Sequence, residues 1–387
     1  MKILAATGSF KDVYSPVEAA EMLRNALDGE KNEISAIPFC DGGEYTYEVL
    51  RSRFDYDVIE SDGVLNAYGV PVKTGYLADG DTAHIVSSRI IRLYPEEDEY
   101  KNPLALTDYG FGQLIADALG RGYRKLILYF GGTSTAACGM GALQALGGEL
   151  YNGHGEKIPV PCTASDLAEI TRIVSPKYRD VHVHVIGDGN SKVDALPGIT
   201  GLKVGKTFSP MKEEIVRKCT QGVNNIVNIT KISPDYDFTG AAGGLLFGLE
   251  QCFDNIEYTL GGLYFSDVLG IESEIEKADL VITGEGRYDN TADGKAPSVI
   301  AGLARKHKKE AVLVCGQIEK KAVKNYAGGV ITCESEPWLA AQGITRLLTC
   351  QEYYDGVSLP EGYSDAVDFF REHTPDEIKK LFRKIGI

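Results

Sequence analysis

In its last third the chain reads Ala278-Asp279-Leu280-Val281-Ile282-Thr283-Gly284-Glu285-Gly286-Arg287. The apolar run stops abruptly at glycines and charged residues, a pattern typical of a buried parallel strand that ends in a turn. In open α/β sheets, ligands bind outside the carboxyl ends of the strands. We therefore expect the charged residues in and just after this segment to lie near a ligand. They are Glu285, Arg287, Asp289 and Lys295. For one such segment alone, a solvated loop would be the better interpretation.

The same design recurs elsewhere in the chain. Short runs of branched apolar residues lead into glycine turns at residues 2–8, 34–43, 126–132 and 312–316. Helical patterns lie between these runs. The first begins with a capping box, Ser15-Pro16-Val17-Glu18, with proline at the first helical position. Alternating strands and helices predict an α/β fold with a mostly parallel sheet and helices on both faces.

The length of 387 residues exceeds one ordinary core, which indicates two domains. Short strand patterns also occur in the middle of the chain, where they are less regular. The predicted first domain has the parallel sheet and comprises residues 1–56, 110–150 and 250–387. The predicted second domain is smaller, is inserted into the first, and comprises residues 57–109 and 151–249.

The C-terminal tail carries a helical pattern. Thr374-Pro375-Asp376-Glu377 is typical of a helix start, because proline is tolerated in the first turn. Four apolar residues then lie along one face. They are Ile378, Leu381, Phe382 and Ile385. We expect this face to pack on the first domain.

Composition excludes some classes of partner. The formal net charge is -15 and the isoelectric point is near 5.0, so no basic surface is expected for nucleic acid. We interpret the acidity as ordinary solubility, and a local group of Lys and Arg can still bind phosphate. The sequence has no apolar run near 20 residues and no secretory signal, which predicts a cytoplasmic protein without membrane association. The eight cysteines lack metal-type spacing and are expected to be free thiols.

Two motifs admit more than one interpretation. His182 and His184 share one face of a predicted strand, where metal binding is an alternative to a simple polar face. We favour the polar face, because no third ligand is evident. The segment Thr239-Gly240-Ala241-Ala242-Gly243-Gly244 enters an apolar run. It predicts either a helix N-terminus that approaches an anion or close packing between helices.

Phosphate chemistry requires backbone N–H groups from glycine turns, cations and carboxylates for magnesium. The chain has no Walker-type phosphate loop. Its glycine turns are Gly42-Gly43, Gly131-Gly132 and residues 239–244.

Several motifs, in order, resemble the bacterial glycerate kinases of glycerate and glucarate degradation. Cys40-Asp41-Gly42-Gly43-Glu44 is similar to the family's A-D-G-G-E turn, and Gly131-Gly132-Thr133-Ser134-Thr135 to its G-G-S-A-T. Phe208-Ser209-Pro210-Met211-Lys212 resembles F-G-P-Q-K, and Gly240–Gly244 resembles its glycine-alanine turn. Leu280–Arg287 matches L-V-I-T-G-E-G-R without change. The resemblance covers roughly residues 1–320.

The resemblance implies a Rossmann-like parallel-sheet domain interrupted by a second α/β domain. It also implies ATP and Mg²⁺ as cofactors, and transfer of the terminal phosphoryl group to a hydroxyl of D-glycerate or a related small hydroxy acid. The sequence leaves the acceptor and the oligomeric state open, a homo-oligomer included.

The predicted site follows from these motifs together. The predicted catalytic residues are Lys11, Asp41, Arg287 and Lys295. The predicted nucleotide-binding residues are Gly42, Gly43, Glu44, Gly131, Gly132, Thr133, Gly243, Gly244, Gly284 and Glu285. The predicted magnesium ligands are Asp41, Glu285 and Asp289. We expect the charged members to converge on one site between the domains, with cations on the phosphates and carboxylates on magnesium or the hydroxyl proton.

The chain departs from the family pattern at polar positions of these turns. The departures are Gly8, Val86, Ala136, Ala137 and Asp293. They leave an active kinase with an altered acceptor as the main hypothesis, and a weak or inactive ligand-binding relative as the alternative. A nucleotide-dependent dehydrogenase ranks last, because no G-x-G-x-x-G follows the first strand.

Overall fold

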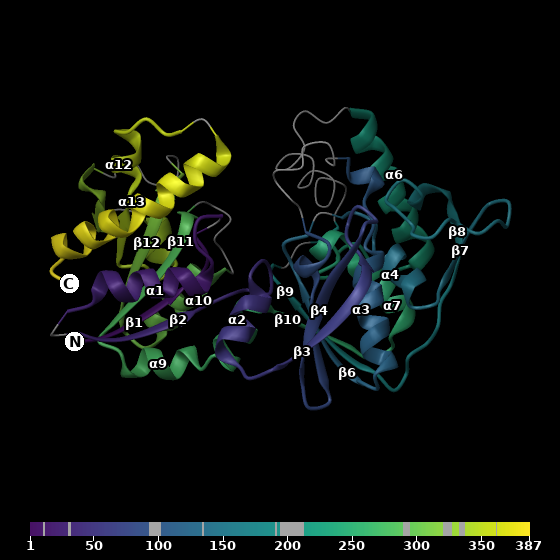
Figure 1. Ribbon diagram of the computed structural model, residues 1–387, viewed down its shortest axis with the longest axis horizontal. Coiled ribbons are helices and arrows are strands. Elements are labelled where there is room, and N and C mark those ends of the chain that lie inside the picture. The colour runs from purple at the N-terminus through teal and green to yellow at the C-terminus, as the bar shows by residue number, and fades with distance from the viewer. Residues whose placement is uncertain are drawn as a thin grey trace. The chain divides into compact units, whose positions relative to one another are not determined.

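Figure 1 shows the computed structural model of the chain. It describes residues 1–10, 12–29, 32–92, 102–133, 135–189, 192–193, 213–288, 295–319, 327–332, 337–360 and 362–387. The chain forms two compact units. The first comprises Met1–Asp41, Glu48–Arg53 and Gly262–Ile387, and the second comprises Gly42–Tyr47 and Phe54–Gly261. Among the described residues, no helix has both the length and the apolar character that a membrane span requires.

The first unit is built on a six-stranded sheet of order β13-β14-β12-β11-β1-β2, parallel except for β13. The strands are β1 (Lys2–Thr7), β2 (Glu33–Pro38), β11 (Leu280–Tyr288), β12 (Glu310–Ile318), β13 (Val330–Thr332) and β14 (Arg346–Thr349). The helices are α1 (Pro16–Leu27), α2 (Thr46–Arg53, grouped here from Glu48), α8 (Gly261–Val268), α9 (Ile271–Lys277), α10 (Ala296–Lys306), α11 (Pro337–Ala341), α12 (Gln351–Asp355) and α13 (Tyr363–Lys384). The first strand and the strand from 280, which the sequence assigns to one domain, lie in one sheet and are direct neighbours.

The order of the strands explains where two helices lie. From β1 the chain passes through α1 to β2 on one side, and from β11 it passes through α10 to β12 on the other. Parallel crossovers are right-handed, so these opposite directions place α1 and α10 on opposite faces of the sheet. The helix α13 joins α1, since Phe382, Leu23 and Ile3 belong to one buried cluster.

Strand β11 extends further than the sequence predicts. Instead of a turn at Gly284, the strand runs on to Tyr288 in parallel register with β12. Glycine fits in this strand because a Cβ atom at Gly284 would lie only 2.8 Å from the carbonyl oxygen of Val314. The ladder of backbone hydrogen bonds therefore continues through the motif, and Glu285 and Arg287 are strand residues rather than turn residues.

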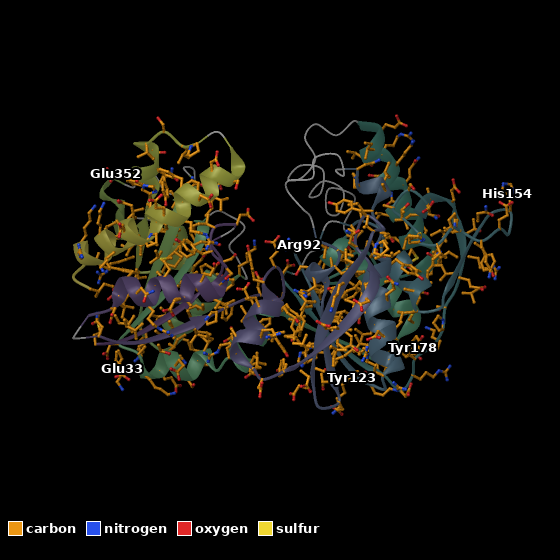
Figure 2. The ribbon with its side chains drawn as sticks, in the orientation of Figure 1. Glu33, Arg92, Tyr123, His154, Tyr178 and Glu352 are labelled. Carbon is orange, nitrogen blue, oxygen red and sulfur yellow. The ribbon has the colours of Figure 1, made fainter. Side chains whose placement is uncertain are left out.

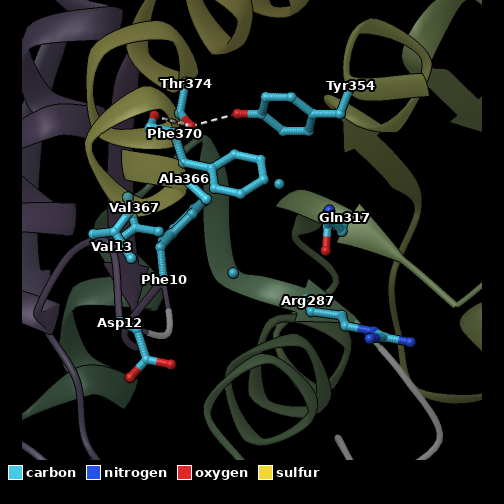
Figure 3. A pocket seen from close by; sticks show the side chains of 12 residues that line it. Phe10, Asp12, Val13, Arg287, Gln317, Tyr354, Ala366, Val367, Phe370 and Thr374 are labelled. Carbon is cyan, nitrogen blue, oxygen red and sulfur yellow. Dashed lines mark hydrogen bonds between the residues drawn. The ribbon is translucent and has the colours of Figure 1, made fainter. Parts of the chain in front are cut away.

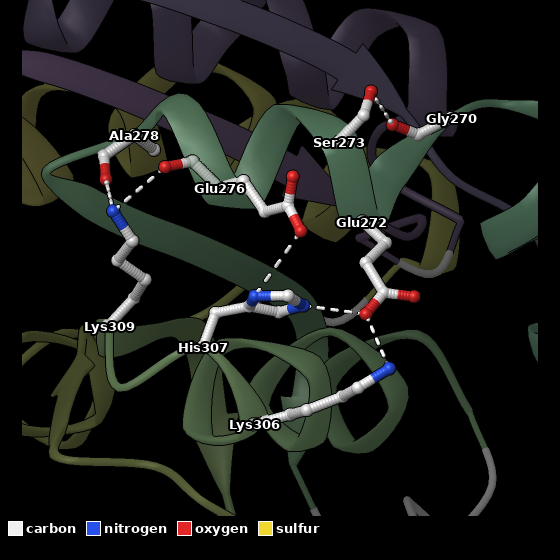
Figure 4. A network of polar contacts seen from close by, with 8 residues as sticks. All are labelled: Gly270, Glu272, Ser273, Glu276, Ala278, Lys306, His307 and Lys309. Carbon is white, nitrogen blue, oxygen red and sulfur yellow. Dashed lines mark hydrogen bonds and ion pairs between the residues drawn. The ribbon is translucent and has the colours of Figure 1, made fainter.

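A polar network holds α9 against the end of α10 (Figure 4). The Glu272 carboxylate lies 2.6 Å from both Lys306 Nζ and His307 Nε2. Lys309 Nζ donates to the carbonyl oxygens of Glu276, at 2.9 Å, and Ala278, at 2.6 Å. The Lys306–Glu272 ion pair is solvent-exposed and therefore contributes little stability. The hydrogen bonds from Lys309 hold the residues after α10 against the end of α9. The network fixes the C-terminal end of α10, whose other end faces the carboxyl edge of the sheet.

The C-terminal helix corrects one boundary prediction. The helix does not begin at Thr374, since α13 runs from Tyr363 to Lys384 with Pro375 inside it. Proline lacks the N–H that would bond to the carbonyl four residues earlier, that of Arg371. The Tyr14 hydroxyl donates to this carbonyl instead. A tertiary contact thus compensates for the proline, which sequence alone could not show. The predicted packing face is confirmed, with Ile378, Leu381 and Phe382 buried and Ile385 partly buried in the first unit.

The second unit has a six-stranded sheet of order β10-β9-β6-β5-β4-β3. Strands β10, β9, β6 and β5 are parallel to one another. Strand β4 is antiparallel to β5, and β3 is antiparallel to β4. They are β3 (Asp57–Leu65), β4 (Pro71–Asp79), β5 (Thr82–Val86), β6 (Lys125–Phe130), β9 (His182–Gly187) and β10 (Ile256–Leu260). A separate pair is formed by β7 (Glu149–Asn152) and β8 (Ile170–Val174). The helices are α3 (Tyr109–Gly120), α4 (Met140–Ala145), α6 (Glu213–Thr230) and α7 (Leu245–Cys252).

The predicted domain boundaries need correction. Residues 110–150 do not join the first sheet, because β6 pairs with β5 and β9 in the second. Residues 54–56 and 250–261 also belong to the second unit, which spans more of the chain than the first rather than less. Both sheets are largely parallel with helical crossovers, so the apolar pattern of β6 suits either one. Only the pairing of distant strands decides between them.

Asp108 ties the start of α3 to the start of α4. Its carboxylate accepts from Gly139 N at 2.7 Å and from Ala142 N at 2.8 Å. These amides belong to the first turn of α4, where no intrahelical partner exists. Burial raises the pKa of Asp108 to about 6, although the backbone hydrogen bonds act in the opposite direction. The carboxyl group therefore fixes the chain directly after the glycine turn that follows β6.

The first prediction concerns Tyr14. Tyr14→Phe leaves the Arg371 carbonyl without its donor, which should lower the free energy of unfolding by about 1–3 kcal/mol. The penalty should shrink when Pro375→Ala restores a backbone N–H. Urea unfolding of the wild type, the two single variants and the double variant measures this penalty. Tyr353→Phe is the control for loss of a neighbouring hydroxyl. Equal stability of the wild type and Tyr14→Phe would contradict the compensation.

The second prediction concerns pH. The pKa of Asp108 is higher in the folded state, so the folded protein binds the proton of this carboxyl group more tightly than the unfolded chain does. The resulting stabilisation of the fold is complete below about pH 4 and is lost as the pH rises through 6. The stability margin of the wild type over Asp108→Asn should therefore fall by about 3 kcal/mol between pH 4 and pH 7. Urea unfolding at intervals across this range measures the margin. A margin independent of pH would show that Asp108 titrates normally.

Candidate functional site

In the first unit, the sheet reverses its winding direction between β1 and β11. This is the position at which open α/β sheets bind ligands, outside the carboxyl ends of the strands. The chain leaving β1 runs beside β11, since Gly8 N donates to Gly284 O at 3.1 Å and Gly286 N donates to Ser9 O at 3.2 Å. The amino end of α10 lies close by, because a Cβ atom at Gly8 would be 3.4 Å from Ala296 Cβ.

Several predicted site residues lie around this reversal point. Glu285 and Arg287 project from the last part of β11, with Arg287 exposed and Glu285 half-buried. Lys295 is the N-cap residue of α10. Two further predicted residues, Lys11 and Asp289, lie outside the described residues.

A cavity of about 270 Å³ opens at this edge of the sheet (Figure 3). Its walls come from the segment after β1, the ends of β11 and β12, and the helices α12 and α13. Gly316, expected to end a strand, lies inside β12, where a Cβ atom would be 2.9 Å from Gly286 O. The lining residues are Phe10, Asp12, Val13, Gly286, Arg287, Gly316, Gln317, Tyr354, Ala366, Val367, Phe370 and Thr374.

In the second unit, two of the predicted glycine turns come together. A Cβ atom at Gly131 would lie 2.5 Å from Gly43 Cα and 2.4 Å from Asp188 Oδ2. One at Gly132 would lie 2.5 Å from Glu44 Cγ. No side chain larger than hydrogen fits at these two positions without displacing backbone or a carboxylate. The turn after β6 therefore packs directly on residues 42–44 and on the residue that follows β9.

The loop after β5 completes this arrangement. Ser87 Oγ lies 3.2 Å from Gly131 O and 3.3 Å from Gly131 N. Ser88 Oγ donates to Gly43 O at 3.4 Å. The carboxyl ends of β5, β6 and β9 thus gather a group we call the glycine cradle. It consists of Gly42, Gly43, Glu44, Ser87, Ser88, Gly131, Gly132, Thr133 and Asp188.

Sequence reasoning missed three members of the cradle. Asp188 directly follows a predicted strand, which is the same signal that identified the other turns, and could have been found. Ser87 and Ser88 follow β5 without a glycine, so no local pattern marks them. Their role depends on the parallel pairing of β5 with β6.

The turn before α7 serves packing within the second unit. The carbonyl of Gly243 accepts from Cys138 N at 3.2 Å, and Gly244 N donates to Ala241 O at 3.0 Å. A Cβ atom at Gly243 would lie 1.9 Å from Thr135 O. Of the two interpretations left open for residues 239–244, these contacts favour close packing. A nucleotide contact of Gly243 and Gly244 stays a prediction.

The departures from the family pattern lie in different environments. Val86, Ala136 and Ala137 are at most 1% exposed, so they are packed in the core rather than facing a ligand as expected. Gly8 differs, because a Cβ atom there would make only ordinary van der Waals contacts. Asp293 lies outside the described residues.

The predicted residues are divided between the two units. Asp41, Gly284, Glu285, Arg287 and Lys295 belong to the first, and the glycine cradle and Gly243–Gly244 belong to the second. Their convergence on a single site stays a prediction. In the described part of the chain, no group of three or more His, Cys, Asp or Glu residues is placed to hold a metal.

The histidines of the second unit also form no such group within the described residues. His184 Nε2 lies 2.8 Å from Thr259 Oγ1, and His182 lies 3.6 Å from the carboxylate of Glu257. His154 lies in the loop that extends from β7 (Figure 2). The polar face of β9 is thus occupied by ordinary cross-strand contacts to β10.

Comparisons with known proteins agree with this fold and these motifs. The model of the glycerate kinase family matches residues 3–337. Glycerate kinase of Bacillus subtilis (strain 168) is 31% identical over 85% of this chain and 88% of its own. Glycerate 2-kinase of Escherichia coli (strain K12) is 28% identical over 82% of this chain and 86% of its own.

A crystal structure of a candidate glycerate kinase 2 from Salmonella typhimurium LT2 has the same fold. It covers 99% of this chain and 98% of its own, with a TM-score of 0.67 and 23% sequence identity. Members of the matched family are kinases, which use a nucleotide, and in this family the substrate is a small molecule. By this match over most of its length, the chain belongs to the glycerate kinase family.

Proposed function

We propose that this protein transfers the terminal phosphoryl group of ATP, with Mg²⁺, to a hydroxyl of glycerate or a related small hydroxy acid. The observation that carries the proposal is the glycine cradle. Three parallel strands deliver their carboxyl ends to it, and its glycines let the turns of the cradle approach one another closely. Catalysis of phosphoryl transfer consists mainly of positioning and electrostatic stabilisation, which such a rigid turn supplies.

The cradle residues fit a magnesium ion. Mg²⁺ is usually held by one or two carboxylates together with substrate phosphates, not by a full set of protein ligands. Asp188 and Glu44 both lie against the Gly131–Gly132 turn, which gives that number of carboxylates. When bound, the ion would neutralise charge on the phosphates. Asp41, Glu285 and Asp289 stay predicted ligands in addition.

The cations of the first unit suit the phosphates and the acceptor carboxylate. Arg287 is exposed and forms no ion pair with a described residue, and Lys295 begins α10, where the helix dipole also favours an anion. In the reaction, an oxygen lone pair of the acceptor hydroxyl forms a bond to the γ-phosphorus as the bond to the β,γ-bridging oxygen breaks. The hydroxyl proton passes to a carboxylate, for which Asp41, Glu44, Glu285 and Asp289 are the candidates.

The third prediction tests the cradle. Asp188→Asn keeps the shape of the side chain and removes its charge, so turnover with magnesium and ATP should fall by about 10²-fold or more. ADP release is measured over a panel of small hydroxy acids that includes D-glycerate. Asp180→Asn, at an exposed ion pair with Arg124, is the matched control and should retain activity. Normal turnover of Asp188→Asn would refute the assignment of this turn.

The fourth prediction concerns Lys295. Lys295→Ala should weaken binding of ATP and of inorganic phosphate by about tenfold, because a cation at a helix N-terminus contributes more to an anionic ligand than to folding. Calorimetry measures binding, and a thermal melt measures stability. Lys379→Ala, on α13, is the control. A lowered melting temperature with unchanged binding would indicate a structural role instead.

The departure at Gly8 favours a second candidate, a relative that binds nucleotide but transfers poorly, because this position lies beside β11 at the winding reversal and carries no carboxylate. Val86, Ala136 and Ala137 also lack the polar atoms of the family pattern, but they are packed in the core. This candidate predicts ATP binding without ADP release for any acid in the panel. Gly8→Asp is the sterically permitted restoration and would then recover turnover, whereas polar groups at 136 and 137 would be buried in the core.

A further inference from the structure

We propose that the cavity at the end of β11 and β12 binds the adenine base of the nucleotide. This inference rests on the proposed function and adds to it the position of the base, within the first unit. The cavity lies at the winding reversal of the sheet, where α/β folds bind nucleotides. Its volume of about 270 Å³ is below the range of about 300–1,000 Å³ typical of sites for whole drug-sized ligands. It therefore suits one planar ring system and not a complete nucleotide.

The walls of the cavity match the faces of a base. Phe10 is 2% exposed and forms one wall with Val13, while Val367 and Phe370 of α13 form another (Figure 3). The Phe370 ring is itself held edge-on by Tyr354, with centroids 4.7 Å apart. Aromatic and branched side chains on a rigid helix favour a flat apolar ligand, since every base has apolar faces that stack.

The polar groups of the cavity differ in their availability. Thr374 donates to the carbonyl of Phe370 and is also hydrogen-bonded to the Tyr354 hydroxyl, so both hydroxyls are engaged. Gln317 lies between Tyr354 and Arg287 in Figure 3, and its amide forms no hydrogen bond with any described residue. A glutamine amide pairs its carbonyl and NH₂ with the amino group and a ring nitrogen of adenine. Gln317 therefore recognises the edge of the base.

Charge at the rim orients the ligand. Arg287 lines the cavity and directs its guanidinium away from Phe10 and Phe370 (Figure 3). A nucleotide with its base between the apolar walls would extend its phosphates toward this cation. The acceptor acid is a poor occupant, because a small anion gains nothing from apolar walls and the Asp12 carboxylate at the rim repels it.

The test compares ATP with inorganic tripolyphosphate, which shares the phosphates and lacks the base. Calorimetry on the full-length protein gives both dissociation constants. Phe370→Ala removes a wall and should raise the constant for ATP about tenfold or more, with that for tripolyphosphate unchanged. Ala366→Phe fills the cavity without deleting any packed group and should also raise the dissociation constant for ATP about tenfold or more, with that for tripolyphosphate unchanged. Gln317→Leu should raise the dissociation constant for ATP several-fold. Phe369→Ala, a neighbour on α13 that does not line the cavity, is the matched control.

The outcomes separate this inference from the proposed function. If folded Ala366→Phe protein binds ATP as the wild type does, the base binds elsewhere and the inference is overturned. The same holds if its affinities for tripolyphosphate and for ATP fall to the same extent. If the variants lose ATP selectively while the wild type phosphorylates no hydroxy acid, the base site stands and the proposed function fails. In the wild type, free adenosine should compete with ATP, and in Ala366→Phe it should not.

Discussion

The pairing of β1 with β11 is the constraint on which the first unit depends. Thr7 Oγ1 donates to Gly284 O at 2.9 Å across 277 residues of sequence. The segment between them contains the second unit, so this pair closes the first sheet around a long insertion. Closing so long a loop costs entropy, but the cost grows only slowly with length, and burial of both strands offsets it. The same pair creates the winding reversal beside which Arg287 and the cavity lie.

Absence of side chains shapes both candidate ligand regions. In the cradle, Gly131 lets the ends of three strands and residues 42–44 approach one another, and any Cβ atom there would meet Asp188 or Gly43. In β11 and β12, Gly284 and Gly316 let two long strands continue past the point where the apolar pattern ends. In both regions the absence of a Cβ atom permits a close approach of backbone segments that a side chain would block.

The two regions differ in the chemistry they offer. The glycine cradle places two carboxylates beside a glycine turn that serine hydroxyls hold in position, and so suits phosphate with magnesium. The cavity of the first unit presents aromatic walls, one amide and one cation, and so suits a base with phosphates leading away from it. A kinase needs both kinds of recognition, because it must hold ATP by more than charge to distinguish it from other polyanions.

The sequence alone determined the α/β class, most strands and the glycine turns at 42–44 and 131–132, because these follow from local periodicity and backbone sterics. The tertiary structure decided what depends on distant partners. Pro375 lies inside a helix because Tyr14 supplies the missing donor. The strand at 125–130 belongs to the second sheet because β5 and β9 flank it. The serines after β5 join the cradle for the same reason: strand pairing and hydrogen bonds across the sheet carry no signal in the residues nearby.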